Sequence, residues 1–125
     1  MATIKSYTDI FQSKKLAEIL SHESADMWWS RCTITDFGGV LKVSYSVEPC
    51  NISQFRNTKE DIPCWSLAAL LNIIPYPTLV EKRLSGWRCA SNNRERKVYL
   101  VGEADNNPIN VCYKMILRLH ELNLL

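Results

Sequence analysis

The end of the chain carries the pattern that most restricts its fold. Apolar residues recur there at helical spacing: Ile109, Cys112, Met115, Ile116, Leu119 and Leu122. Asn107 can cap the first turn, and Pro108 suits the first helical position. A helix with a single apolar stripe must bury that stripe on another element. The rest of the chain is therefore expected to supply a sheet or helices that cover it.

Two more segments have helical character. The first covers about residues 8–20, where Ser6 or Thr8 is expected to cap the helix and an apolar face follows: Leu16, Ala17, Ile19 and Leu20. The second begins near Pro63, a residue tolerated in a first turn, and Pro75 ends it after a strongly apolar run.

Strand-like segments lie between these helices. Residues 28–35 and 40–47 are rich in β-branched and aromatic residues, and the Asp-Phe-Gly-Gly sequence between them predicts a hairpin turn. Residues 78–89, with a break near Ser85-Gly86, and residues 96–101 predict a second pair of strands.

Polar segments connect these elements. Residues 48–62 read as a connecting loop, and residues 91–93 (Ser-Asn-Asn) as the turn of the second hairpin. The element order α-β-β-α-β-β-α predicts an α+β fold, with an antiparallel sheet of about four strands and helices mainly on one face. With 125 residues, the chain is expected to form one domain over residues 1–125.

The chain is expected to be cytoplasmic and to have no membrane segment. Charged residues such as Lys5, Asp9 and Lys14 interrupt the start, where an export signal needs an unbroken apolar core. No apolar run is long enough to span a bilayer. Five cysteines without a C-x-x-C pair favour reduced thiols.

Familiar catalytic and cofactor motifs are missing. The four glycines match neither the G-x-x-x-x-G-K-[ST] nor the G-x-G-x-x-G phosphate-binding pattern. His22 and His120 lie far apart in sequence, so they do not form a metal-binding pair. Asp36-Phe37-Gly38 matches a kinase tripeptide, but the chain is too short for that fold. We therefore predict no catalytic residue, no cofactor and no metal site, and we favour a protein that is not an enzyme.

One segment concentrates positive charge. Residues 81–97 hold six basic and two acidic residues, a local charge of +4 within a chain of net charge +2. The candidate contacts there are Arg83, Trp87, Arg88, Arg94, Arg96 and Lys97. Such a hairpin can neutralise phosphates while the indole stacks on a base. The alternative is a solvated hairpin whose charges protect a sheet edge.

Two adjacent tryptophans form a second candidate site. Trp28 and Trp29 stand at the start of a predicted strand, where they can line a ligand pocket. The alternative places one ring in the core and the other at its rim.

Several blocks resemble a family of small uncharacterised proteins from phages and mobile elements of anaerobic gut bacteria. The blocks are residues 4–9, 12–20, 23–27, 62–71 (Ile-Pro-Cys-Trp-Ser-Leu-Ala-Ala-Leu-Leu) and 107–125. They cover roughly half of the chain. The resemblance implies a context in phages and their hosts, and it carries over no activity, cofactor or site residue.

Three functional hypotheses remain open. The leading hypothesis is a non-enzymatic binding or interaction module, a phage or mobile-element accessory protein whose partner is a host or phage protein. The alternative is a protein that binds a small nucleotide or signalling molecule. The third is a nucleic-acid-binding protein, through residues 81–97, or a small nuclease. The sequence leaves the oligomeric state open, a homo-oligomer included.

Overall fold

The computed structural model describes residues 5–35, 37–49, 61–95 and 97–125. The chain divides into two compact units, one formed by Asp9–Trp65 and the other by Ser66–Leu125 together with Met1–Thr8. Each unit contains one three-stranded antiparallel sheet. The α+β class is thus confirmed, but the expected sheet of about four strands is replaced by two sheets of three. That the whole chain forms one domain stays a prediction.

In the Asp9–Trp65 unit, a short helix precedes the sheet. Helix α1 (Ile10–Ala17) begins at Asp9, whose carboxylate accepts a hydrogen bond from the Gln12 N–H at 2.7 Å. The Gln12 side chain accepts one in return from the Asp9 N–H at 3.1 Å. Because this capping box satisfies two free N–H groups, the helix begins after Asp9 and not at the predicted Ser6 or Thr8.

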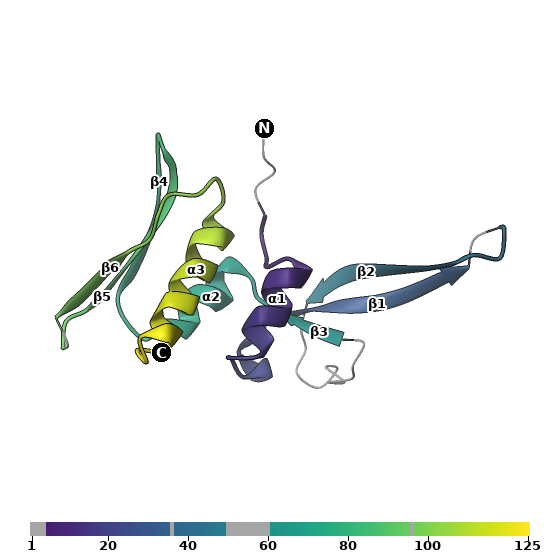
Figure 1. Cartoon of the computed structure of the whole chain (residues 1–125), viewed down its shortest axis with the longest axis horizontal. Helices are drawn as coiled ribbons and strands as arrows, with labels where there is room; N and C mark the ends of the chain where they lie inside the picture. Colours follow the sequence, from purple (N-terminus) through teal and green to yellow (C-terminus); the bar gives the residue numbers. More distant parts are fainter. Residues whose placement is uncertain (1–4, 36, 50–60, 96) are drawn as a thin grey trace. The chain divides into compact units, whose positions relative to one another are not determined.

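The first sheet has the strand order β2-β1-β3. Strands β1 (Met27–Thr35) and β2 (Leu41–Pro49) form the expected hairpin, and the 3-10 turn η1 (His22–Ser24) leads into β1. Strand β3 (Asp61–Cys64) was not expected, since residues 48–62 read as loop and Pro63 as a helix start. Pro63 sits in an edge strand, where a residue without an N–H is tolerated. Helix α1 packs beside β3 (Figure 1).

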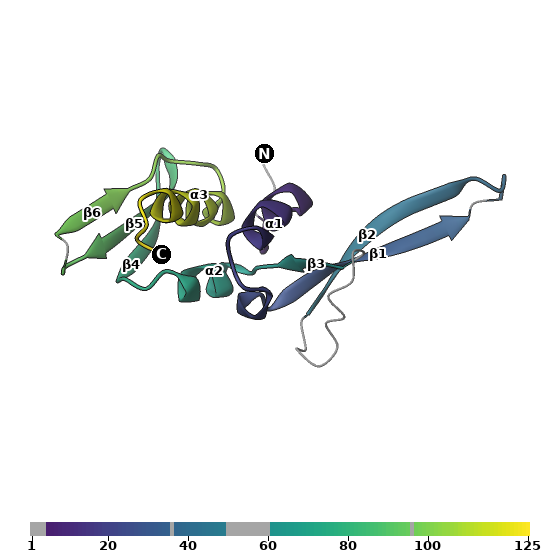
Figure 2. The same ribbon diagram turned by 60° about the horizontal axis from the view of Figure 1, so that its bottom comes forward.

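The other unit has an α-β-β-β-α order. Helix α2 (Leu67–Ile73), capped by the Ser66 hydroxyl, precedes β4 (Thr78–Arg83), β5 (Gly86–Asn93) and β6 (Val98–Val101), and helix α3 (Pro108–Glu121) follows. The three strands pair in sequence order, and α3 packs on the central strand β5 (Figure 2).

The break expected near Ser85-Gly86 is the turn between β4 and β5, so one predicted strand is a hairpin. Residues 91–93, expected as a turn, are the last residues of β5 instead. Helix α3 confirms its prediction in detail, because Asn107 accepts the Ile109 N–H at 3.1 Å and Pro108 occupies the first turn. Its apolar stripe is buried as expected from Ile109 to Leu119, but Leu122, also predicted to belong to the stripe, is the C-cap residue and is 39% exposed.

A short extension continues the second sheet past β6. The Trp87 N–H donates to the Asp105 carbonyl at 2.6 Å, and the Asp105 N–H donates back to the Trp87 carbonyl at 3.0 Å. The Cys89 carbonyl accepts a hydrogen bond from the Gly102 N–H at 2.9 Å. Gly102 thus pairs with Cys89 and Asp105 with Trp87, so the two residues between them, Glu103 and Ala104, stand opposite the single residue Arg88. This extra residue is a β-bulge next to the central strand.

Gly86 allows the close approach of Asp105. It has a φ of +119°, and a Cβ at this position would lie 2.5 Å from the Asp105 carbonyl oxygen. Only glycine fits such a backbone conformation and such a short distance.

In the described residues, no helix is long and apolar enough to cross a membrane.

Candidate functional site

The β1–β2 hairpin is longer than the sheet that supports it. β1 and β2 pair over nine positions, from Met27↔Pro49 to Thr35↔Leu41. β3 pairs only with Met27–Ser30 of β1. Among the described residues, the outer half of the hairpin is therefore a two-stranded ribbon. Isolated two-stranded hairpins are only marginally stable in water, so this half gains little stability from its own strand pairing.

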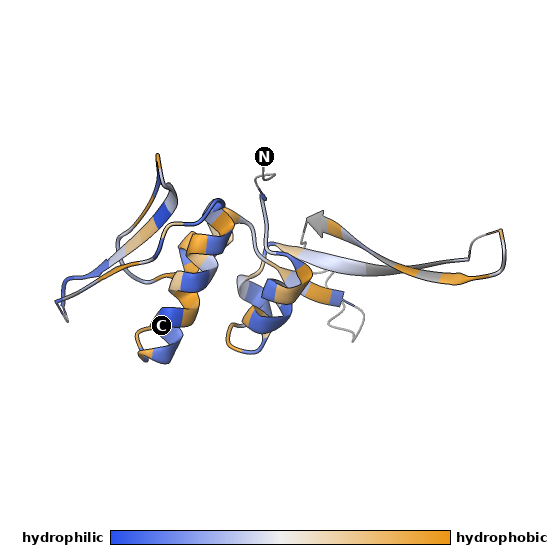
Figure 3. Ribbon diagram, turned by 45° about the horizontal axis from the view of Figure 1, so that its top comes forward, coloured by the Kyte–Doolittle hydropathy of each residue, from blue (hydrophilic) through white to orange (hydrophobic). Residues whose placement is uncertain are grey.

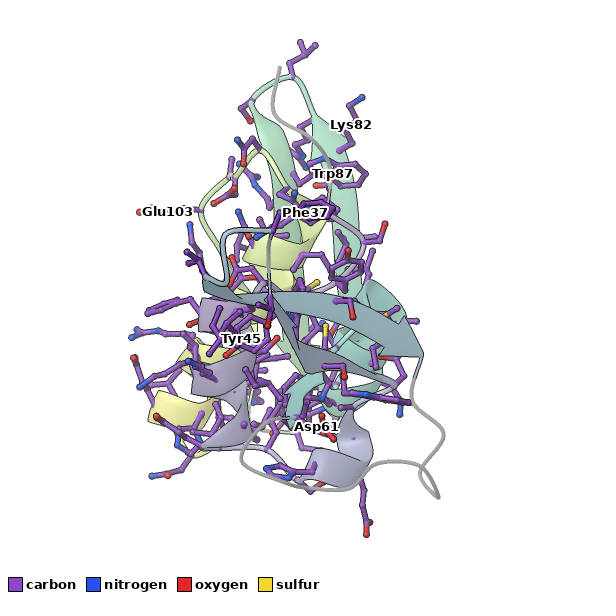
Figure 4. All side chains as sticks on the ribbon, turned by 90° about the vertical axis from the view of Figure 1, so that its right-hand side faces the viewer. Phe37, Tyr45, Asp61, Lys82, Trp87 and Glu103 are labelled. Atoms are coloured by element: carbon purple, nitrogen blue, oxygen red, sulfur yellow. The ribbon has the colours of Figure 1, made fainter. Side chains whose placement is uncertain are left out.

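This ribbon exposes apolar side chains along β2. Leu41 is 68% exposed, Val43 49% and Tyr45 36%. Successive side chains of a strand alternate between its faces, so these three residues share one face. Phe37 and Val40 add exposed apolar groups at the turn. We call Leu41, Val43 and Tyr45 the ribbon face; Figure 3 shows hydrophobic segments along the outer ribbon, and Figure 4 labels Tyr45 and Phe37.

The predicted tryptophan site lies at the base of the same hairpin. Trp28 is buried opposite Pro63, and Trp29 is half-buried between Val47 and Ile62. One ring is thus in the core and the other at its rim, as the alternative interpretation held. The buried Trp28 therefore belongs to the core of the Asp9–Trp65 unit, at the base of the ribbon.

The predicted basic segment is divided between the two ends of β5. Arg83 lies at the β4–β5 end, where its Nε donates to Glu81 at 2.6 Å. Arg94 and Lys97 lie in the β5–β6 turn, while Arg96 is outside the described residues. An eight-residue strand separates the two ends by about 23 Å. The structure therefore does not gather these charges at one place.

Trp87 and Arg88 lie on opposite faces of the sheet, because they are neighbours on one strand. Trp87 shares its face with Cys89, whose free thiol is hydrogen-bonded to the thiol of Cys112 on α3. It stands opposite Lys82 on β4 (Figure 4). A phosphate held by Arg88 and a base stacked on Trp87 would thus contact different faces.

Arg88 lies on the face of the sheet that turns away from α3. Its Nε is buried and has no hydrogen-bond partner among the described residues. Glu81 is its cross-strand neighbour, but that carboxylate is bound to Arg83. A buried N–H group without a partner costs about 1–3 kcal/mol. Arg88 Nε is therefore an unsatisfied donor on this face of the sheet.

A shallow hollow lies on the same face of the sheet as Arg88, although Arg88 does not line it. It measures about 250 Å³, and its lining is Pro77, Thr78, Leu79, Ala90, Asn92 and Tyr99. Leu79 is 56% exposed and Tyr99 64%. Ala90 is two positions from Arg88 along β5, so both residues face the hollow's side of the sheet. The hollow combines an aromatic ring with a nearby cation.

The buried thiols offer little chemistry. The hydrogen bond with Cys89, together with burial, raises the pKa of the Cys112 thiol far above its ordinary value. The same bond lowers the pKa of Cys89, against the effect of burial. Both side chains are fully buried. A nucleophile needs access as well as a thiolate, so this pair belongs to the core.

In the part of the chain that the structure describes, no group of three His, Cys, Asp or Glu residues could hold a metal ion.

The ribbon face is the feature that sequence reasoning missed. Its alternating residues were visible as a strand pattern, but that pattern does not say whether the apolar side is covered.

Comparison with known proteins gives no relative, since no family model, no curated protein and no solved structure matches this chain.

Proposed function

We propose that this protein is a non-enzymatic interaction module whose ribbon docks on another protein. The observation that carries the proposal is the row of exposed apolar residues on β2, at Leu41, Val43 and Tyr45. Exposed apolar patches of this kind are typical of interaction surfaces. The resemblance to phage proteins suggests a host or phage protein as the partner.

Burial of the ribbon face gives a useful binding energy. A fully buried Val or Leu side chain contributes roughly 1.5–3 kcal/mol relative to an exposed one. Leu41 is 68% exposed, Val43 49% and Tyr45 36%. Burial of what remains exposed on all three therefore contributes a few kcal/mol in total, by order of magnitude. The ribbon also gains order from a partner, because its outer half has only two strands.

β2 also offers backbone hydrogen bonds. It is an edge strand of its sheet, and among the described strands only β1 pairs with it, which leaves the other side of its main chain for a further strand. Strand addition at such an edge supplies hydrogen bonds, and the side chains supply selectivity. The ribbon thus combines an apolar face with a pairing edge.

Photo-crosslinking in cells tests this proposal. A benzoylphenylalanine that replaces Tyr45 is expected to form a discrete crosslinked product after irradiation. The matched control replaces Tyr99, an exposed tyrosine on the other sheet, and is expected to give no such product. Equal crosslinking from both positions, or none from Tyr45, would contradict the proposal.

A second candidate function is the binding of a small nucleotide-like ligand, favoured by the Nε of Arg88, which has no hydrogen-bond partner within the described part of the chain. An anionic group would satisfy this guanidinium, while a ring would rest on Tyr99 and Leu79 in the hollow. Nucleotides and signalling nucleotides combine these two chemistries.

Thermal unfolding with pooled nucleotides tests this candidate. A ligand at a hundred times its Kd stabilises a protein by about 2.7 kcal/mol. We expect Arg88→Gln to abolish this stabilisation, whereas Arg94→Gln, at the other end of β5, should retain it. A stabilisation that survives Arg88→Gln would place the ligand elsewhere.

The third candidate, a nucleic-acid-binding surface over residues 81–97, has less support. Its charges lie at two ends of β5, and Trp87 lies on the face opposite Arg88. A groove that follows a phosphate backbone needs its cations in a continuous row.

A further inference from the structure

We infer that the partner of β2 is the β2 strand of a second copy of this chain, paired antiparallel with Tyr45 on the two-fold axis. This inference rests on the proposed function, because it names the occupant of the same ribbon, and it puts a second copy of the chain there in place of a host or phage protein. It follows from the position of β2 in the sheet and from the order of its residues.

β2 has the geometry that such pairing needs. It is an edge strand of nine residues, and among the described strands only β1 is hydrogen-bonded to it. Two identical edges related by a two-fold axis meet as antiparallel strands, which is the commonest symmetry of soluble oligomers. The result would be a four-stranded ribbon in place of two ribbons of two strands.

The residue order of β2 is complementary to itself around Tyr45. With Tyr45 opposite Tyr45, the cross-strand pairs are Leu41↔Pro49, Lys42↔Glu48, Val43↔Val47 and Ser44↔Ser46. Each residue meets one of like polarity or opposite charge. Aromatic pairs, apolar pairs and opposite charges directly across two strands each stabilise a sheet by about 0.2–1 kcal/mol.

The two charged positions select this register. Lys42 stands opposite Glu48 twice in the dimer, once on each side of the axis. With Ser44 on the axis, Lys42 would stand opposite Ser46 instead, and a parallel pairing in register would place Lys42 opposite Lys42. A single lysine on an edge strand normally prevents self-association. Here Glu48 of the second copy, which stands opposite Lys42 in this register, compensates the charge of the lysine.

The ribbon face becomes continuous in this dimer. Val43, Tyr45 and Val47 lie on one side of β2, so the two copies place their apolar rows next to each other. The junction is smaller than a standard interface of roughly 1,600 Å². We therefore expect a weak dimer, with a Kd in the micromolar range.

Sedimentation velocity with charge-reversed variants tests the inference. The native chain is expected to sediment as a monomer–dimer equilibrium. Lys42→Glu and Glu48→Lys each create two like-charge pairs and should weaken the dimer at least tenfold. The double variant K42E/E48K restores opposite charges and should regain dimerisation, which a merely misfolded variant would not do.

Disulfide trapping tests the register. In a background with Cys32→Ser and Cys50→Ser, Tyr45→Cys is expected to form a covalent dimer under mild oxidation. Residues directly opposite in an antiparallel pair have Cα atoms roughly 4.5–5.5 Å apart, within disulfide range. Val43→Cys alone should not crosslink, but a mixture with Val47→Cys should.

Two results would overturn the inference: a native chain that stays monomeric at the highest soluble concentration, or a double variant that fails to recover dimerisation. The crosslinking from Tyr45 then distinguishes a failure of the second-copy inference from a failure of the proposed function. If Tyr45 still crosslinks to a different protein, only the second copy is wrong. If it crosslinks to nothing, the proposed function is wrong as well.

Discussion

The main chains of Trp87 and Asp105 exchange two hydrogen bonds, which tie the segment before α3 to the central strand β5. The side chain of Asp105 then accepts hydrogen bonds from two residues of α3, Asn110 at 3.0 Å and Lys114 at 2.9 Å. Asp105 therefore connects the sheet to the helix that covers it. This connection gives the first prediction.

Asp105→Asn is expected to destabilise the protein by about 1 kcal/mol at neutral pH, because half of the Lys114 side chain is exposed and solvent screens the pair. The hydrogen bond from Lys114 holds the pKa of Asp105 below its ordinary value, although burial opposes this. A lowered folded-state pKa adds stability above the unfolded value of about 3.9, and that stability is lost as the pH falls through the folded pKa.

Urea unfolding of both proteins from pH 7 to pH 2 measures this difference. The gap between native and Asp105→Asn should be constant above about pH 5 and shrink below about pH 4. A gap that stays constant down to pH 2 would show that the carboxylate contributes nothing through its charge.

Gly86→Ala is expected to cost at least about 2 kcal/mol, because it combines a backbone conformation reserved for glycine with a collision. The new Cβ would lie 2.5 Å from the Asp105 carbonyl oxygen. Gly39→Ala is the matched control, since Gly39 also has a positive φ, +78°, but the added Cβ would have no atom of the described residues within 4 Å. It should cost about 1 kcal/mol. Equal losses in chemical denaturation would contradict the close packing of Gly86 on Asp105.

Ser24→Ala tests the packing of the other unit. The buried Trp65 donates its indole N–H to the Ser24 hydroxyl at 3.0 Å, and that hydroxyl donates to the Ser21 carbonyl at 2.6 Å. Loss of these bonds should cost about 1–2 kcal/mol. Ser21→Ala is the control, because Ser21 is exposed and its side chain makes no capping bond. A neutral Ser24→Ala in urea unfolding would argue against the Trp65 bond.

The buried cysteines should resist thiol reagents. Cys64, Cys89 and Cys112 are fully buried, and the Cys112 thiol has a raised pKa because of its bond with Cys89 and its burial. In the Cys32→Ser, Cys50→Ser background, Ellman's reagent should find almost no reactive thiol until denaturant is added. One thiol that reacts within seconds under native conditions would show that the core opens.

The sequence predicts elements whose signals are local. Asn107 and Pro108 mark the start of α3, and the apolar spacing from Ile109 to Leu119 marks its buried face. The Gly38-Gly39 turn between β1 and β2 was equally readable. In each case a few adjacent residues determine the backbone, so no knowledge of the rest of the chain is needed.

The remaining features depend on contacts between distant segments. Pro63 has the chemistry of a helix start, but pairing with Trp28 places it in a strand. Arg88 and Trp87 are neighbours in sequence, yet the alternation of β5 separates their side chains. The number of sheets follows from which strands pair, and strand pairing is not encoded within any one strand.

Hydrogen–deuterium exchange of β2 at low and high protein concentration tests most directly the central claim that this edge pairs with the same edge of a second copy. We predict that the N–H groups of β2, from Leu41 to Glu48, exchange more slowly at high concentration, while those of Val98–Val101, an edge strand of the other sheet, are unchanged. Exchange in Leu41–Pro49 that does not depend on concentration would contradict self-pairing through β2.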